Sequence, residues 1–265
     1  MILRACSRRY RKTAGPLRIV ACAAVAAAIS GAPAGAARAA LDETPETVVF
    51  GDQGPLGGGT AHAWVRVDAA GRPTTFGVSF DPAALAGLPP THAETALALP
   101  RLAGLPFVSA VIDWAPHGHP PGELYGVPHF DVHFYAIAEN VRTAIVASGP
   151  AAEATPAPDL VPAEFAGGDT VPAMGRHYIA RSAAEYRGGT FGATPIYGYW
   201  NGHLAFVEAM VALSYLQTHP AHSEELARPE RVETAGAYPG RWSVAYDPTA
   251  QRYDIAFGKL VTLSP

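Results

Sequence analysis

The sequence predicts a single domain of mainly β structure (α+β), either a β-barrel or a sandwich-like pair of sheets, with two or three short helices. The chain of 265 residues contains 25 Pro and 27 Gly, which interrupt long helices and favour turns. Several short segments alternate apolar and polar residues, as strands with one buried face do. Two of these segments flank Asn201-Gly202, a dipeptide that favours the tight type I′ turn of a β-hairpin.

The expected elements follow from these local patterns. Asp81 followed by Pro82 begins a short helix, because Asp caps a helix N-terminus and Pro fits its first position. Two further short helices are expected over 139–146 and 211–218. Residues 148–170 are rich in Pro and Ala without periodicity, which predicts a long surface loop within the one domain. The expected strands lie within 47–80, with a turn at 69–73, and at 107–114, 128–137, 175–180, 194–200, 203–210, 242–246 and 252–257.

Residues 1–39 have the pattern of an export signal peptide. Basic residues precede an apolar, Ala-rich stretch at 19–34, and Ala37-Arg38-Ala39 fits a cleavage site with small flanking residues. The apolar stretch is too short and too rich in Ala, Gly and Pro for a membrane span. We therefore expect a secreted or periplasmic protein. The export route, general secretory or twin-arginine, stays open, and a lipid anchor at Cys22 is the weaker alternative.

The composition of the expected mature domain, residues 40–265, limits its chemistry. Both cysteines lie before residue 40, so a disulfide, a thiolate ligand and a cysteine nucleophile are all excluded. Residues 1–39 contain seven of the 19 basic residues and none of the 23 acidic ones, which leaves a net charge of about −11 on the remainder. Such an acidic balance argues against binding to nucleic acids or anionic membranes.

Four of the ten histidines lie between His117 and Tyr135, together with one Glu and one Asp. Neutral imidazole is the commonest protein ligand of zinc, copper, nickel and iron, so this segment indicates a metal site. In a strand, alternate side chains share a face. A strand over 128–137 therefore places four polar side chains on one face and three apolar side chains on the other. The polar ones are His129, Asp131, His133 and Tyr135.

A second pair of histidines precedes this strand. His117, His119 and Glu123 have the H-x-H-x3-E spacing of the first metal motif of cupin barrels. Pro120-Pro121-Gly122 interrupts this motif and no second cupin motif follows. We therefore keep only the expectation that these residues bind a metal, and not membership of the cupin family. His177 on a later strand and Glu208 within an apolar run could complete a site, since a buried carboxylate is costly unless it is paired or bound to a metal.

We therefore predict one divalent metal held by His119, His129 and His133, with His117 or His177 as a further ligand. Zinc is the first choice, because such a ligand set needs no redox chemistry. Copper and iron stay open.

The role of this site has several interpretations. In an enzyme, the metal would activate water or a substrate oxygen, with Glu123, Asp131 or Glu208 as general base. The reaction is not determined by the sequence. Alternatively, the protein is non-catalytic, either an envelope stress-response protein or a protein that binds a small molecule or a metal. A third interpretation is a network of His–carboxylate hydrogen bonds that only fixes a turn.

Four motifs together support a resemblance to a known family. They are HGHPP at 117–121, PHFDVHFY at 128–135, MG-x-HY at 174–178 and IYGYWNG at 196–202. With these motifs the chain resembles a family of exported bacterial proteins of unknown function, typified by a Thermus protein under sigma-E/anti-sigma-E control. The resemblance covers roughly residues 45–215. It implies a β-rich fold and an extracytoplasmic location, allows homo-oligomers, and brings no established activity.

Overall fold

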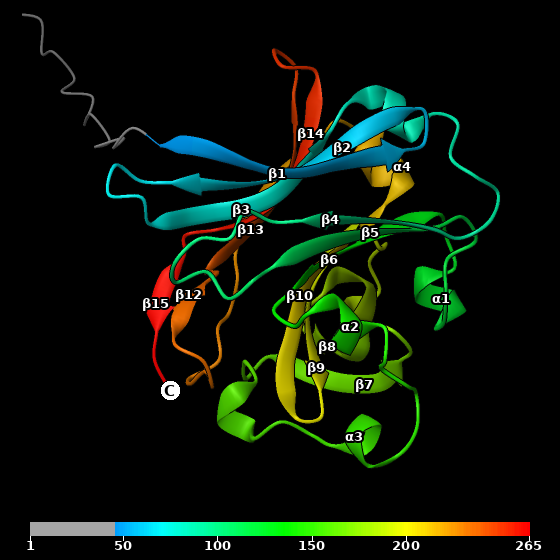
Figure 1. Ribbon diagram of the computed structural model, residues 1–265. Helices are drawn as coiled ribbons and strands as arrows, with labels where there is room; N and C mark the ends of the chain where they lie inside the picture. The colour runs from blue at the N-terminus through cyan, green and yellow to red at the C-terminus, as the bar shows by residue number, and fades with distance from the viewer. Residues whose placement is uncertain (1–45) are drawn as a thin grey trace, which may run out of the picture. The chain divides into compact units, whose positions relative to one another are not determined.

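The computed structural model describes residues 46–265, which form two packed antiparallel β-sheets and a separate two-stranded ribbon (Figure 1). The prediction of a mainly β fold is confirmed. Within the described residues neither sheet closes on itself, so the sandwich is the correct alternative and the barrel is wrong. Residues 46–265 contain four short α-helices and three 3₁₀ helices, where two or three short helices were expected. The predicted signal peptide, residues 1–39, lies outside the described residues.

The first sheet has six strands in the order β1-β2-β3-β14-β13-β11. Its strands are β1 (Thr47–Leu56), β2 (Gly59–Val67), β3 (Pro73–Phe80), β14 (Arg252–Gly258), β13 (Arg241–Asp247) and β11 (Ala221–Glu225). The second sheet has seven strands in the order β4-β5-β6-β10-β9-β8-β7. Its strands are β4 (Ala93–Ala98), β5 (Ser109–Ala115), β6 (His129–Tyr135), β10 (His203–Ala212), β9 (Ala193–Trp200), β8 (Gly175–Ala180) and β7 (Phe165–Val171).

The remaining elements are short connections. The ribbon pairs β12 (Gly236–Tyr238) with β15 (Val261–Leu263). The α-helices are α1 (Gly122–Tyr125), α2 (Glu139–Arg142), α3 (Pro150–Glu153) and α4 (Leu213–Leu216). The 3₁₀ helices are η1 (Pro82–Leu85), η2 (Pro158–Leu160) and η3 (Ala184–Arg187). Across residues 46–265, no helix has the length and apolar character that a membrane crossing needs.

Aromatic side chains from both sheets form the core between them. The ring of Phe76 on β3 lies 5.1 Å from that of Phe134 on β6, and Phe80 lies 6.3 Å from Phe130. In Figure 1 the blue and cyan strands β1–β3 accordingly lie over the green strands β4–β6. A second, smaller apolar cluster includes Phe206 and Met210 of β10. It lies on the opposite face of the seven-stranded sheet, where the polar side chains of β6 also point.

The structure confirms the Asn-Gly hairpin. Trp200 pairs with His203 across the two-residue loop, and Asn201 and Gly202 have φ values of 50° and 79°, as a type I′ turn requires. Asp81 also caps η1, since its Oδ1 accepts from the backbone N–H of Ala84 at 3.2 Å. The helix is a single 3₁₀ turn.

The segment 148–170, expected as a long surface loop, also carries short regular elements. This segment contains α3, η2 and the first part of β7. Strand β7 lies at the edge of the seven-stranded sheet and exposes most of its residues, so its sequence lacks the alternation that marks a half-buried strand. Only Phe165, which is buried, anchors its start.

Candidate metal centre

Strand β6 separates apolar from polar side chains as its sequence predicts. Phe130, Val132 and Phe134 belong to the core between the sheets. The alternate residues face the other way, and every residue of the strand is buried. Phe191 covers part of this polar row, with its ring 5.5 Å from that of His129. The histidine face is therefore enclosed, and its charged groups need partners within the protein.

The strands beside β6 add two carboxylates to this face. Glu208 on β10 lies directly opposite His133, and Asp113 on β5 lies directly opposite Asp131. Both carboxylates are only 1 % exposed. The sequence had suggested Glu208, whereas Asp113 was missed. The signal that could have found Asp113 is its position as the single charged residue in the apolar strand SAVIDWA.

Two imidazoles converge on one oxygen of Glu208. The Nε2 atoms of His133 and His177 each lie 3.4 Å from Oε2 of Glu208. Each of the three residues offers a ligand atom within 4.8 Å of the other two, as a metal site requires. The side chains of His133 and Glu208 are 0 % and 1 % exposed, and that of His177 is 16 % exposed. We call this group, His133, His177 and Glu208, the buried site.

The separation of these atoms fits a metal better than a direct hydrogen bond. Charge-assisted N–H···O bonds are about 2.7–2.9 Å long. Ligand atoms at about 2.0–2.1 Å from a tetrahedral zinc are about 3.3–3.4 Å from each other. In the described part of the chain, Nε2 of His133 and Oε2 of Glu208 are buried without a hydrogen-bond partner. A cation between them would satisfy these atoms.

Gly198 on β9 allows His177 to approach from β8. His177 lies opposite Gly198, and a Cβ on Gly198 would stand 2.0 Å from the ring of Phe206. The Phe206 ring fills that space and packs 4.8 Å from His133 and 5.1 Å from His177. The missing side chain thus lets one aromatic ring support both imidazoles of the buried site.

Asp113 faces His133 from the opposite side. Its Oδ2 lies 3.1 Å from Nδ1 of His133, while Nε2 of the same ring faces Glu208. Metal-bound histidines usually donate their second ring N–H to a carboxylate or carbonyl, which fixes the tautomer and raises ligand basicity. The exposed His92 reaches the other oxygen of Asp113 at 3.2 Å.

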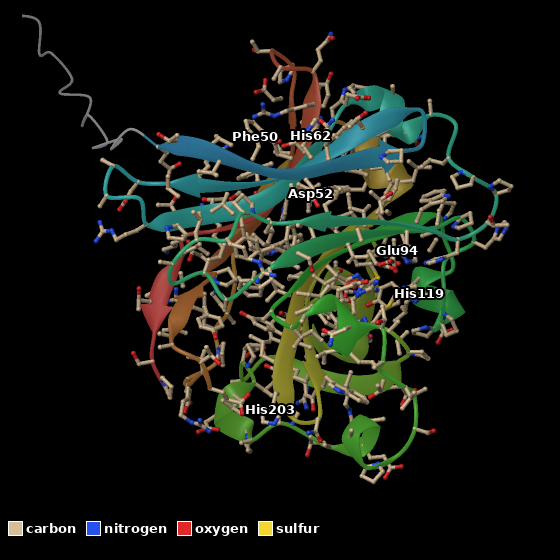
Figure 2. All side chains as sticks on the ribbon, viewed as in Figure 1. Phe50, Asp52, His62, Glu94, His119 and His203 are labelled. Atoms are coloured by element: carbon tan, nitrogen blue, oxygen red, sulfur yellow. The ribbon has the colours of Figure 1, made fainter. Side chains whose placement is uncertain are left out.

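A second group lies nearer the start of β6. His129 Nε2 is 3.2 Å from Oδ1 of Asp131, and His119 Nε2 is 3.5 Å from Oδ2 of the same carboxylate. These three residues also place one ligand atom each within 4.8 Å of the others. His119 comes from the loop before α1 and is 41 % exposed, whereas His129 is fully buried. Figure 2 shows His119 beside α1. We call this group, His119, His129 and Asp131, the outer site.

The carboxylates shift the pKa values of the imidazoles. Burial alone would lower the pKa of His133, but the charges of Glu208 and Asp113 outweigh burial and raise the pKa to about 9. Burial likewise opposes the charged form of His119, yet its contact with Asp131 raises the pKa to about 9. Burial would raise the pKa of Asp131, and its contacts with His119 and His129 hold that pKa below the usual range instead. Each site therefore favours a positive charge, which a proton or a metal ion can supply.

The predicted ligands fall into two groups. His119 and His129 lie together with Asp131, while His133 lies with His177 and Glu208. Asp131 and Glu208 thus stand among the candidate ligands, where the sequence had suggested general bases. His117 and Glu123 are exposed and form none of the contacts described above.

Comparisons of the chain with protein-family models, curated proteins and solved structures found no match. The interpretation of the site therefore rests on its geometry and chemistry. The resemblance to an exported bacterial family stays a prediction from the sequence motifs.

Proposed function

We propose that the protein is an exported metal-binding protein that holds a divalent transition metal at the buried site. One observation carries the proposal: two imidazole nitrogens, that of the buried His133 and that of the largely buried His177, face the same buried carboxylate oxygen, each at 3.4 Å. Two histidines and one carboxylate are a ligand set that zinc uses in catalytic centres, where the fourth position holds water or substrate. Zinc is the first choice, and copper and iron suit the same ligand types.

The residues of the site would have distinct roles around the metal. His133, His177 and Glu208 would be ligands, and Asp113 would hold His133 in position through Nδ1. His177 is the ligand with measurable exposure, so solvent or a small molecule would reach the metal from its side. A bound metal with an open position can activate water or polarise a substrate oxygen.

The strongest rival is an ion network without metal. In that case His133 would be an imidazolium between Asp113 and Glu208, which its raised pKa of about 9 allows. The rival needs no ion for stability and gives no specific metal stoichiometry. Metal binding and its loss in single variants therefore separate the two interpretations.

The test is metal analysis of protein purified without a histidine tag and equilibrated with zinc. His177→Ala and Glu208→Gln should each lose one equivalent relative to the wild type. The matched control is His203→Ala, which removes an exposed histidine of the same sheet that pairs with Glu233. Wild-type stoichiometry in His177→Ala and Glu208→Gln would exclude the buried site as a metal centre.

A further inference from the structure

We propose that the outer site is a second, separate metal site that is open to solvent. It extends the proposed function but shares no residue with the buried site. The two oxygens of Asp131 each face a different imidazole, at 3.2 Å for His129 and 3.5 Å for His119. One carboxylate and two imidazoles again suit a divalent metal such as zinc, copper or nickel.

Backbone carbonyls fix the tautomers of both outer histidines. Nδ1 of His129 lies 2.7 Å from the carbonyl oxygen of Val127, and Nδ1 of His119 lies 2.9 Å from that of Pro120. A carbonyl oxygen only accepts, so Nδ1 carries the proton in each ring. In the neutral rings, Nε2 then directs a lone pair at the Asp131 carboxylate. Two acceptors that face each other need a proton or a metal ion between them, and a metal ion can serve both imidazoles and the carboxylate at once.

The burial of these atoms makes an unfilled site costly. Among residues 46–265, His129 Nε2 and Asp131 Oδ1 are buried and lack a hydrogen-bond partner. Asp131 also stands directly opposite Asp113 across β5 and β6, and like charges in such a pair destabilise a sheet. Each of these carboxylates faces its own imidazoles: His119 and His129 lie at Asp131, and His133 and His92 lie at Asp113. A positive charge bound at Asp131 would therefore be separate from one bound beside Asp113.

The two sites are too far apart for one bridged metal pair. Asp131 and His133 are two residues apart on β6, which corresponds to about 6–7 Å along a strand. Metal ions that share bridging ligands in two-metal centres are about 3.5–4 Å apart. We therefore expect two sites that each hold one ion.

The outer site has an accessible side that the buried site largely lacks. Its third ligand, His119, is 41 % exposed and belongs to the loop between β5 and α1. This loop folds back closely on α1: the His119 N–H donates to the Tyr125 carbonyl at 3.2 Å, and a Cβ on Gly118 would stand 1.9 Å from that oxygen. A metal at the outer site would tie the His119–Tyr125 segment to β6 and would take water or a small oxygen or nitrogen donor from solvent.

The test is a titration of chelator-treated protein with zinc ions alone, in competition with a chromophoric chelator. The wild type should bind two equivalents and His119→Ala one. The control His117→Ala removes an exposed histidine two residues away and should keep both equivalents. Zinc should also slow amide hydrogen exchange over residues 119–126 in the wild type and in His177→Ala, but not in His119→Ala.

The outcomes distinguish the two sites. Two equivalents in His119→Ala, or a single wild-type equivalent that only His177→Ala removes, would overturn the outer site and leave the buried one. A single wild-type equivalent that His119→Ala removes and His177→Ala keeps would support the outer site and exclude the buried one. An absence of zinc binding in the wild type would overturn both.

Discussion

Replacing Asp113 by Asn tests whether this residue supports a metal through His133. The two side chains are nearly equal in size, so the change removes the charge and leaves the packing in place. Asp113 is 1 % exposed, and its Oδ2 lies 3.1 Å from Nδ1 of His133. Loss of a partner that orients a metal-bound histidine weakens metal binding roughly 10- to 100-fold. Because this contact is buried, we expect the upper part of that range, roughly 30- to 100-fold, or about 2.0–2.7 kcal/mol.

The assay is a competition titration with zinc at fixed pH, using variants whose thermal unfolding confirms a folded protein. The control is Asp169→Asn, which removes an exposed carboxylate on β7 of the same sheet and should leave zinc affinity unchanged. Zinc affinity of Asp113→Asn within twofold of the wild type would refute the support role. An equal loss in Asp169→Asn would assign the effect to overall charge.

Three further predictions follow from the same geometry. Gly198→Ala places a Cβ 2.0 Å from the Phe206 ring, so it should displace that ring, weaken zinc binding and lower the free energy of unfolding by about 1–3 kcal/mol. Calorimetry measures this loss, and the control Gly122→Ala should leave the stability nearly unchanged, because nothing lies within 4 Å of the added carbon. In the metal-free protein, the pKa of His133 is raised to about 9 from an ordinary 6.5. Protonation of His133 therefore contributes its full stabilisation of the fold below pH 6.5, and this contribution is lost as the pH rises to about 9. Denaturant titrations should therefore show falling stability over this interval while zinc affinity rises, because fewer protons compete; rising stability of the metal-free protein would contradict the assigned environment. Zinc at a free concentration of about 100 times its dissociation constant should stabilise the protein by about 2.7 kcal/mol and raise its melting temperature by roughly 5–10 °C; an unchanged melting temperature after chelation would argue against tight binding to the folded state.

Local patterns in the sequence predicted the elements that carry the site. The alternation in PHFDVHFY is strong because one face of β6 packs in the core and the other carries polar groups. The Asn-Gly hairpin was predictable because only a few residue pairs adopt positive φ at both turn positions. These features depend on residues close together in the chain.

The grouping of the ligands depends on strand register, which the sequence leaves open. His119, His129 and His133 were expected to share one metal. The pairing of β6 with β10 places Glu208 beside His133, and the position of β8 adds His177 on the same side. The histidines of β6 therefore divide between two carboxylates, and this division arises from contacts between residues far apart in the chain.

Anomalous X-ray diffraction at the zinc edge, from crystals of the zinc-equilibrated protein, tests the central claim most directly. We predict a peak about 2.0–2.2 Å from Nε2 of His133, Nε2 of His177 and a carboxylate oxygen of Glu208. The contradicting result is no peak at this position, with the imidazoles donating directly to the carboxylates at about 2.7–2.9 Å. The buried histidine face would then be an ion network that holds the sheet together without a metal.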